Sequence, residues 1–114
     1  MKFKLIVSFI APDLTDKVVK TAKSAGATGD VIIPARGSGI EQKSFLGLSI
    51  NEKTDVILFV VEEHCVNNII AAIDKEINLE VPGNGIVIVL NIDKVAGLSK
   101  QIKKIRENLN NEQL

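Results

Sequence analysis

The amino-acid sequence predicts a single α+β domain in which two helices cover one face of a four-stranded antiparallel sheet. Four runs rich in β-branched and aromatic residues are typical of strands. Two stretches between them carry apolar residues at helical spacing, and turn-forming residues separate the segments. The order β-α-β-β-α-β is the split βαβ arrangement, also called ferredoxin-like. Right-handed crossovers then place both helices on the same face of the sheet.

The strands are predicted at residues 3–10, 29–35, 54–62 and 86–92. The first reads FKLIVSFI and the third reads TDVILFVVE, and both are dominated by the residue types that strands favour. The fourth follows VPGNG (81–85), whose proline and glycines are typical of a turn.

Three segments are predicted to be helical. The first begins at Asp13, whose carboxylate can cap the first-turn amides, and ends at Gly26, which adopts left-handed backbone angles readily. We expect a domain over residues 1–97, followed by a C-terminal helix and tail over residues 98–114. The apolar positions of the three helices are Leu14, Val18, Ala22 and Ala25, then Val66, Ile69, Ile70, Ile73 and Ile77, then Leu98, Ile102, Ile105 and Leu109.

The composition indicates a water-soluble protein with no bulk attraction to polyanions. The 114 residues are 46% hydrophobic, which is enough for a packed core, and basic and acidic residues each number 14. A formal net charge of zero argues against nucleic acid or an anionic membrane as a partner recruited by charge. The chain has one cysteine, Cys65, and its first apolar run is too short for a signal peptide or membrane span. We therefore expect a cytoplasmic location.

Both faces of the predicted sheet are apolar, although its helices can cover only one. Apolar residues occupy odd and even positions of the third strand, and the fourth is apolar without a break over 86–90. Four strands of about six residues give a face of about 380 Å², the size at which an exposed apolar patch usually marks an interface. We therefore predict self-association through the sheet. The alternative is that the C-terminal helix covers part of this face.

The connection between the second and third strands is unusually long. It leaves the second strand at the glycine pair Gly37-Ser38-Gly39 and spans about residues 38–53. Loops of this length in a small domain are generally functional rather than simple connections. We interpret it as a flexible loop that presents a surface to a partner.

These segments together resemble the P-II nitrogen-regulatory proteins over residues 3–97. The resemblance rests on the element order, GATGDV (26–31) entering the second strand, RGSG (36–39) leaving it, the long loop, and VPGNG (81–85). It implies a homotrimeric signalling protein without enzymatic activity. Such proteins bind a small effector between subunits and regulate a membrane transporter or metabolic enzyme through the loop.

The resemblance also implies a ligand and its site. The ligand is an adenine nucleotide (ATP, ADP or AMP), and glycines suit it because they let backbone amides approach phosphate oxygens. This chain lacks cations where the family has them, for example at Ile40 and Ile86, and it has Glu41 in place of a glutamine. Three alternatives therefore stay open. The site binds a nucleotide with fewer phosphates, it binds another ligand, or the glycines only form turns. The matching positions are Gly29, Arg36, Gly37, Gly39, Gly83, Asn84 and Gly85.

The run Glu62-Glu63-His64-Cys65 supports an alternative, a metal-binding ferredoxin-like trimer that resembles the divalent-ion tolerance proteins. Its candidate ligands are Glu63, His64 and Cys65. Consecutive residues of a helix point about 100° apart, so the run cannot converge on one ion within a single chain. No three- or four-ligand zinc pattern is visible, and a metal bridged between subunits stays open. We find no nucleophile with a base beside it and no P-loop, and we therefore assign no catalytic residue.

Overall fold

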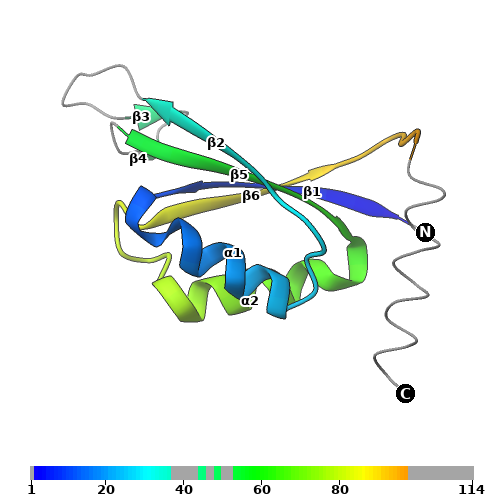
Figure 1. Cartoon of the computed structure of the whole chain (residues 1–114), viewed down its shortest axis with the longest axis horizontal. Helices are drawn as coiled ribbons and strands as arrows, with labels where there is room; N and C mark the ends of the chain where they lie inside the picture. The colour runs from blue at the N-terminus through cyan, green and yellow to red at the C-terminus, as the bar shows by residue number, and fades with distance from the viewer. Residues whose placement is uncertain (1, 37–43, 46–47, 50–52, 98–114) are drawn as a thin grey trace.

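The computed structural model describes residues 2–36, 44–45, 48–49 and 53–97, and it confirms the predicted α+β, ferredoxin-like fold (Figure 1). Two helices lie on one side of a twisted four-stranded sheet. The predicted C-terminal helix, over 98–114, lies outside the described residues. In chain order the strands and helices are β1 (Phe3–Ile10), α1 (Thr15–Ser24), β2 (Val31–Arg36), β3 (Ser44–Phe45), β4 (Leu48–Ser49), β5 (Lys53–Glu62), α2 (Val66–Ile77) and β6 (Gly85–Asn91).

The sheet has the strand order β2-β5-β1-β6, and every neighbouring pair is antiparallel. Two register rows show the alignment: Pro34–Asp55–Ile10–Gly85 and Val31–Leu58–Val7–Ile88. The C-terminal ends of β1 and β2 and the start of β5 and β6 therefore lie at one end of the sheet. This end carries the stem of the long loop and the turn before β6.

Part of the predicted loop forms regular structure. The short strands β3 and β4 pair with each other, with Ser44 opposite Ser49 and Phe45 opposite Leu48. No strand run is visible there in the sequence, because a two-residue strand is too short to show a hydrophobic period.

The prediction that Asp13 caps the first helix is wrong. The chain leaves β1 through a 3-10 turn over Pro12–Leu14, in which Leu14 N–H donates to Ala11 C=O at 2.8 Å. The α-helix then starts at Thr15. Leu14 occupies its N-cap position, and no side chain caps the helix. Pro12 fixes the start of this turn, which shifts the helix past Asp13. The predicted end is confirmed, since Gly26 has φ +125°.

The core lies between the helices and the sheet. Alternate residues of β1 and β5 point to the helices and are almost fully buried, and they meet one face of each helix. No helix in the described residues has the length and apolar composition that crossing a bilayer requires. The core consists of Ile6, Ile10, Val18, Ala22, Ala27, Ile57, Phe59, Val61, Ile69, Ile73 and Ile77.

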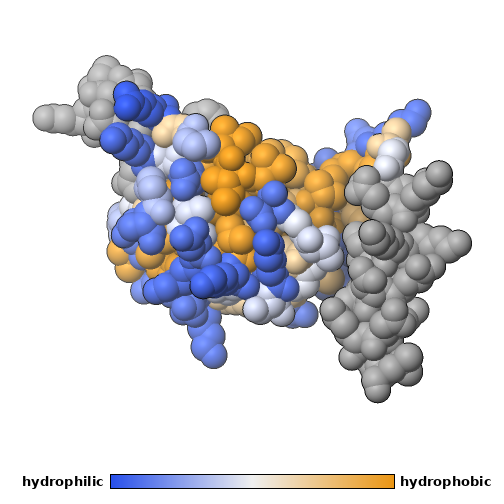
Figure 2. All heavy atoms as spheres, in the orientation of Figure 1, coloured by the Kyte–Doolittle hydropathy of each residue, from blue (hydrophilic) through white to orange (hydrophobic). Residues whose placement is uncertain are grey.

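The opposite face of the sheet is apolar and has no helix over it in the described residues. We call it the open face. Figure 2 shows hydrophobic side chains gathered along the helix-free side of the sheet, while hydrophilic side chains cover much of the helix layer. Four of these side chains are strongly exposed: Val31 by 56%, Ile33 by 46%, Val60 by 43% and Leu90 by 47%. The open face consists of Phe3, Leu5, Val7, Phe9, Val31, Ile33, Ala35, Thr54, Val56, Leu58, Val60, Ile86, Ile88 and Leu90.

Candidate functional site

A groove lies at the stem of the long loop. Strands β2 and β5 end their pairing with Arg36 opposite Lys53, the residues at which the chain enters and leaves the loop. Beside this pair is a groove of about 520 Å³, within the size range of small-molecule sites. Its lining combines apolar rings with charged groups: Pro12, Pro34, Ala35, Arg36, Lys53, Thr54 and Asp55.

Hydrogen bonds from two threonines fix the walls of the groove. Thr15 Oγ1 in the first turn of α1 donates to Asp55 Oδ2 at 2.6 Å. Thr54 Oγ1 donates to the backbone oxygen of Ile10 at 3.1 Å, and Thr54 is buried. Because these bonds join β5 to α1 and to the end of β1, the groove is part of the rigid domain rather than of the loop.

The turn before β6 lies at the same end of the sheet and is held by Asn84. Its side-chain amide donates to Ile77 O at 2.6 Å and to Asn78 O at 3.3 Å, which ties the turn to the end of α2. The backbone oxygen of Asn84 accepts from Ala11 N–H at 3.2 Å. Gly83 has φ +90°, a conformation that favours glycine.

The family model of nitrogen regulatory protein P-II matches residues 3–102. The chain belongs to the P-II family. Members of this family are signalling regulators rather than enzymes. No sequence among the curated proteins matches the chain significantly.

Solved structures share the fold at low sequence identity. A PII-like signalling protein from Thermus thermophilus is 24% identical with TM-score 0.60, over 81% of this chain and 90% of that one. A protein of unknown function from Pediococcus pentosaceus is 16% identical with TM-score 0.62, over 85% and 98%. Arabidopsis thaliana PII bound to citrate is 21% identical with TM-score 0.64, over 85% and 83%.

The ligand positions that the P-II resemblance implies do not converge in one chain. Arg36 lies on the edge strand β2 and Gly85 on the opposite edge strand β6, three inter-strand spacings or about 14 Å apart. Gly29 precedes the other end of β2, so the length of that strand, about 17 Å, separates it from Arg36. Gly37 and Gly39 lie outside the described residues. Gly29, Arg36 and Gly85 of one chain therefore lie too far apart to contact one small chemical group.

Two of these glycines differ in what the fold demands of them. A Cβ on Gly85 would lie 2.7 Å from Ile10 Cδ1 and 3.2 Å from Phe9 O, so any larger residue would force the buried Ile10 or the backbone to shift. A Cβ on Gly29 would have no atom within 4 Å, and Gly29 does not have a positive φ. Gly85 is thus explained by packing within one chain, and Gly29 is not.

The candidate ligands of the metal-binding alternative are occupied by other contacts or separated. His64 Nδ1 lies 3.3 Å from Glu62 Oε2, and the His64 side chain is 74% exposed. The half-buried Cys65 packs against Gly26, where an added Cβ would lie 3.2 Å from its Sγ. Burial and, secondarily, the charge of Glu62 raise the pKa of the Cys65 thiol. In the ranges that the structure describes, no three His, Cys, Asp or Glu side chains gather as a metal site would need.

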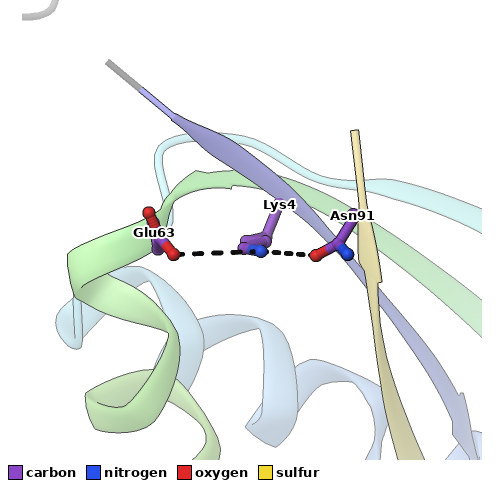
Figure 3. Close-up of polar contacts among 3 residues, drawn as sticks. All are labelled: Lys4, Glu63 and Asn91. Atoms are coloured by element: carbon purple, nitrogen blue, oxygen red, sulfur yellow. Dashed lines mark hydrogen bonds and ion pairs between the residues drawn. The ribbon is translucent and has the colours of Figure 1, made fainter. Parts of the chain in front are cut away.

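Sequence reasoning missed a polar cluster at the far end of the sheet. Figure 3 shows Lys4 of β1 between Glu63, in the 3-10 turn Glu63–Cys65 that precedes α2, and Asn91 at the end of β6. Lys4 Nζ donates to Asn91 Oδ1 and lies 3.9 Å from Glu63 Oε1. The cluster joins three elements, and it directs Glu63 to Lys4 rather than to His64 or Cys65. Lys4 is the only charged residue in the strand run 3–10, which was the one signal that could have marked it.

Proposed function

We propose that the chain acts as a trimeric P-II signalling protein that binds a small effector, an adenine nucleotide, in a crevice between neighbouring subunits. In this proposal the effector changes the conformation of the loop around residues 38–53, and the loop regulates a membrane transporter or a metabolic enzyme in the cytoplasm. The observation that carries the proposal is the open face, an apolar sheet surface that the described helices leave uncovered.

The open face supports assembly through the sheet. Val60, Leu5 and Leu90 form one row across β5, β1 and β6, and Val60 and Leu90 remain 43% and 47% exposed. Burying apolar surface contributes about 25 cal/mol per Å², so a contiguous face of this kind favours association. P-II proteins typically form trimers, which is the closed assembly that we propose.

The positions of the glycines support a ligand site shared between subunits. Gly29 lies far from the turn at Gly83–Gly85 within one chain, so a second chain has to supply one of the two. Gly29 leaves open space at its Cβ position, which a ligand or a neighbouring backbone can occupy. Arg36 does not belong to the open face. Its position on β2 places its side chain on the helix face of the sheet.

The ligand class follows from phosphate chemistry and from a relative. Backbone amides of a glycine turn can bind phosphate oxygens, but the family's cations are replaced at positions such as Ile86. We therefore expect AMP or ADP to bind more tightly than ATP. Arabidopsis PII was solved bound to citrate, which makes a small polycarboxylate the second ligand to test. An effector that prefers one loop conformation shifts the population of the loop, and this shift is the signal.

Variants of the open face test the assembly. Val60→Glu places a charge on the open face at a side chain that is 43% exposed in one chain, so the single chain still folds. Val81→Glu is the matched control, because Val81 is 44% exposed but lies in the turn after α2. By light scattering we expect three times 12.3 kDa for the wild type and Val81→Glu, and smaller species for Val60→Glu. A wild type that is monomeric at micromolar concentration would refute the trimer.

Ligand binding tests the shared site. Isothermal titration with AMP, ADP, ATP and citrate should show binding to the wild type and loss of binding in Val60→Glu. Gly29→Ala should keep the melting temperature and the trimer mass but weaken binding at least tenfold. Unchanged affinity in Gly29→Ala would remove Gly29 from the site. A thermal shift with zinc alone that His64→Ala and Cys65→Ser abolish would support the metal-binding alternative instead.

A further inference from the structure

Lys4 and Asn91 meet at the far end of the sheet, although 87 positions separate them in the chain. They are direct partners in the antiparallel register of β1 and β6, so their side chains lie on the same face of the sheet. The Lys4 side chain is 22% exposed, and its Nζ donates a hydrogen bond to Asn91 Oδ1 (Figure 3). The amine nitrogen of Lys4 therefore lies next to Cγ of Asn91, the carbon to which this oxygen is bonded.

Glu63 brings a carboxylate to the same amine. Its Oε1 lies 3.9 Å from Lys4 Nζ, and Figure 3 shows it on the side of Lys4 away from Asn91. The backbone fixes this placement, because Glu63 N–H donates to Lys2 O at 2.9 Å at the start of the 3-10 turn. The Glu63 side chain is 52% exposed, so it is free to close to hydrogen-bond distance. An amine, a carboxamide and a carboxylate are thus gathered from three elements of the fold.

We propose that Lys4 and Asn91 form an isopeptide bond within the chain, with Glu63 as the base and acid of the reaction. Glu63 takes a proton from the Lys4 ammonium, and the free amine attacks Cγ of Asn91. A bond forms between Lys4 Nζ and Cγ, a second proton passes from Nζ to Nδ2 of Asn91, and the Cγ–Nδ2 bond breaks. Ammonia leaves and takes the proton from Glu63 as ammonium. No oxidant, reductant or other reactant takes part.

The folded chain supplies the proximity that this reaction lacks in solution. Holding two reacting groups in contact corresponds to an effective concentration on the order of 10⁵ M or more. A positioned acid–base group adds a factor on the order of 10² to 10⁴ once it reaches hydrogen-bond distance. The bond has to form only once in each molecule, and the released ammonia diffuses away. A slow reaction therefore still goes to completion.

The bond would pin an edge strand of the sheet. Among the described residues, β6 pairs with β1 alone, and Lys4–Asn91 is the last row of this pairing at the far end. A covalent link in this row prevents β6 from separating from β1. It also closes a long loop in the unfolded chain, which is the condition under which a cross-link stabilises most. The link needs neither a second subunit nor an effector, so it is independent of the function proposed above.

Mass spectrometry of the full-length protein tests the proposal. After incubation in the folded state at neutral pH, most molecules should be lighter than the sequence mass by one ammonia. A tryptic digest should then contain a branched peptide that joins Lys4 to Asn91. An unchanged mass overturns the proposal. So does a loss of ammonia without the branched peptide, because a succinimide at another asparagine, such as Asn84 before Gly85, gives the same mass.

Two variants test the roles of Lys4 and Glu63. Lys4→Arg keeps the positive charge beside Glu63 but has no amine that can attack, so it should retain the full sequence mass. Glu63→Gln keeps the shape of the side chain and removes the base, and the branched peptide should appear at least tenfold more slowly. Glu76→Gln makes the same change on the exposed side of α2 and should react at the wild-type rate. A wild-type rate in Glu63→Gln would refute the role of Glu63, and a loss of ammonia in Lys4→Arg would refute the bond.

Urea unfolding separates the covalent bond from the ion pair. Lys4→Arg preserves the charge pair, so its lower unfolding midpoint relative to the cross-linked wild type would report the bond itself. Wild type that has been incubated in urea, where the three groups are apart, should keep the full sequence mass. Formation of the branched peptide in the unfolded chain would contradict a reaction that depends on the fold.

Discussion

Thr15 and Asp55 join the first turn of α1 to β5 through a hydrogen bond of 2.6 Å. Thr15 is buried, so its hydroxyl cannot exchange this partner for water freely. Thr15→Val keeps the shape of the side chain and removes the donor. Because a hydrogen bond to a charged group contributes about 1.5 to 3 kcal/mol, we expect the free energy of unfolding to fall by about 1.5 kcal/mol in urea titrations.

Thr15→Ser is the control for this prediction, since it keeps the hydroxyl and removes only a methyl group. It should lie closer to the wild type than Thr15→Val does. Equal stability of Thr15→Val and the wild type would mean that Asp55 finds another donor in the groove.

The turn before β6 provides a second prediction. Gly85→Ala introduces a Cβ that would lie 2.7 Å from Ile10 Cδ1 and 3.2 Å from the backbone oxygen of Phe9. Overpacking of this kind costs about 1 to 3 kcal/mol, so we expect a loss of about 2 kcal/mol in unfolding free energy. Gly29→Ala should change it by less than about 0.5 kcal/mol, because its Cβ meets open space. Two equally damaging substitutions would contradict the different roles assigned to these glycines.

Ser8 is a position at which we expect a substitution to stabilise the protein. Its side chain is fully buried on β1 between Ile57 and Val87 of the neighbouring strands. Among the described residues its hydroxyl has no hydrogen-bond partner. An unsatisfied buried hydroxyl costs about 1 to 3 kcal/mol, so Ser8→Ala should raise the unfolding free energy by about 1 kcal/mol. A clear loss of stability, measured by the same urea titration, would reveal a buried water on the hydroxyl.

The Cys65 thiol is expected to react slowly with alkylating reagents. Burial first, and the neighbouring charge of Glu62 second, raise its pKa above the ordinary value, because both disfavour the thiolate. The rate of iodoacetamide labelling should therefore rise with pH to a midpoint above the value of about 8.5 for an unperturbed thiol. In the urea-unfolded chain the midpoint should return to that value.

The raised pKa of the Cys65 thiol also determines how the stability of the protein changes with pH. The folded state binds the thiol proton more tightly than the unfolded state does. The resulting contribution to the free energy of unfolding is therefore fully present below the pKa of the unfolded chain. It is lost as pH rises through the folded pKa. Glu62→Gln should lower the folded midpoint only partly, because burial remains. If Glu62→Gln removed more than half of the difference between the folded and unfolded midpoints, the charge of Glu62 rather than burial would be the larger cause.

Local patterns predicted the helices and strands because each carries its own period. Phe3–Ile10 and Val66–Ile77 match the predicted strand and helix, and both have apolar residues at regular spacing. The second strand starts at Val31 rather than at residue 29, and Asp30, just before it, lies 3.1 Å from Lys23 Nζ of α1. An ion pair of this kind depends on tertiary structure, and no local pattern encodes it.

The candidate site was predictable in its residue types but not in its layout. Arg36 and the Gly83–Gly85 turn were recognisable from the sequence, whereas their placement on opposite edge strands follows only from the strand order. Lys53 was not selected, because its significance depends on the register that sets it opposite Arg36. The contact of Lys4 with Asn91 joins residues 87 positions apart, which no sequence spacing indicates.

The two hydrogen bonds of the Asn84 side chain also bear on the chemical ageing of the protein. Asn84 precedes Gly85, and asparagine before glycine loses its amide most readily, since the unhindered glycine nitrogen can close a succinimide ring. Here the amide is held by Ile77 O at 2.6 Å and Asn78 O at 3.3 Å, so folding slows this reaction. Once deamidated, the side chain would bring a carboxylate against two carbonyl oxygens and would loosen the end of α2. The storage lifetime of a preparation is thereby linked to how well this turn stays closed.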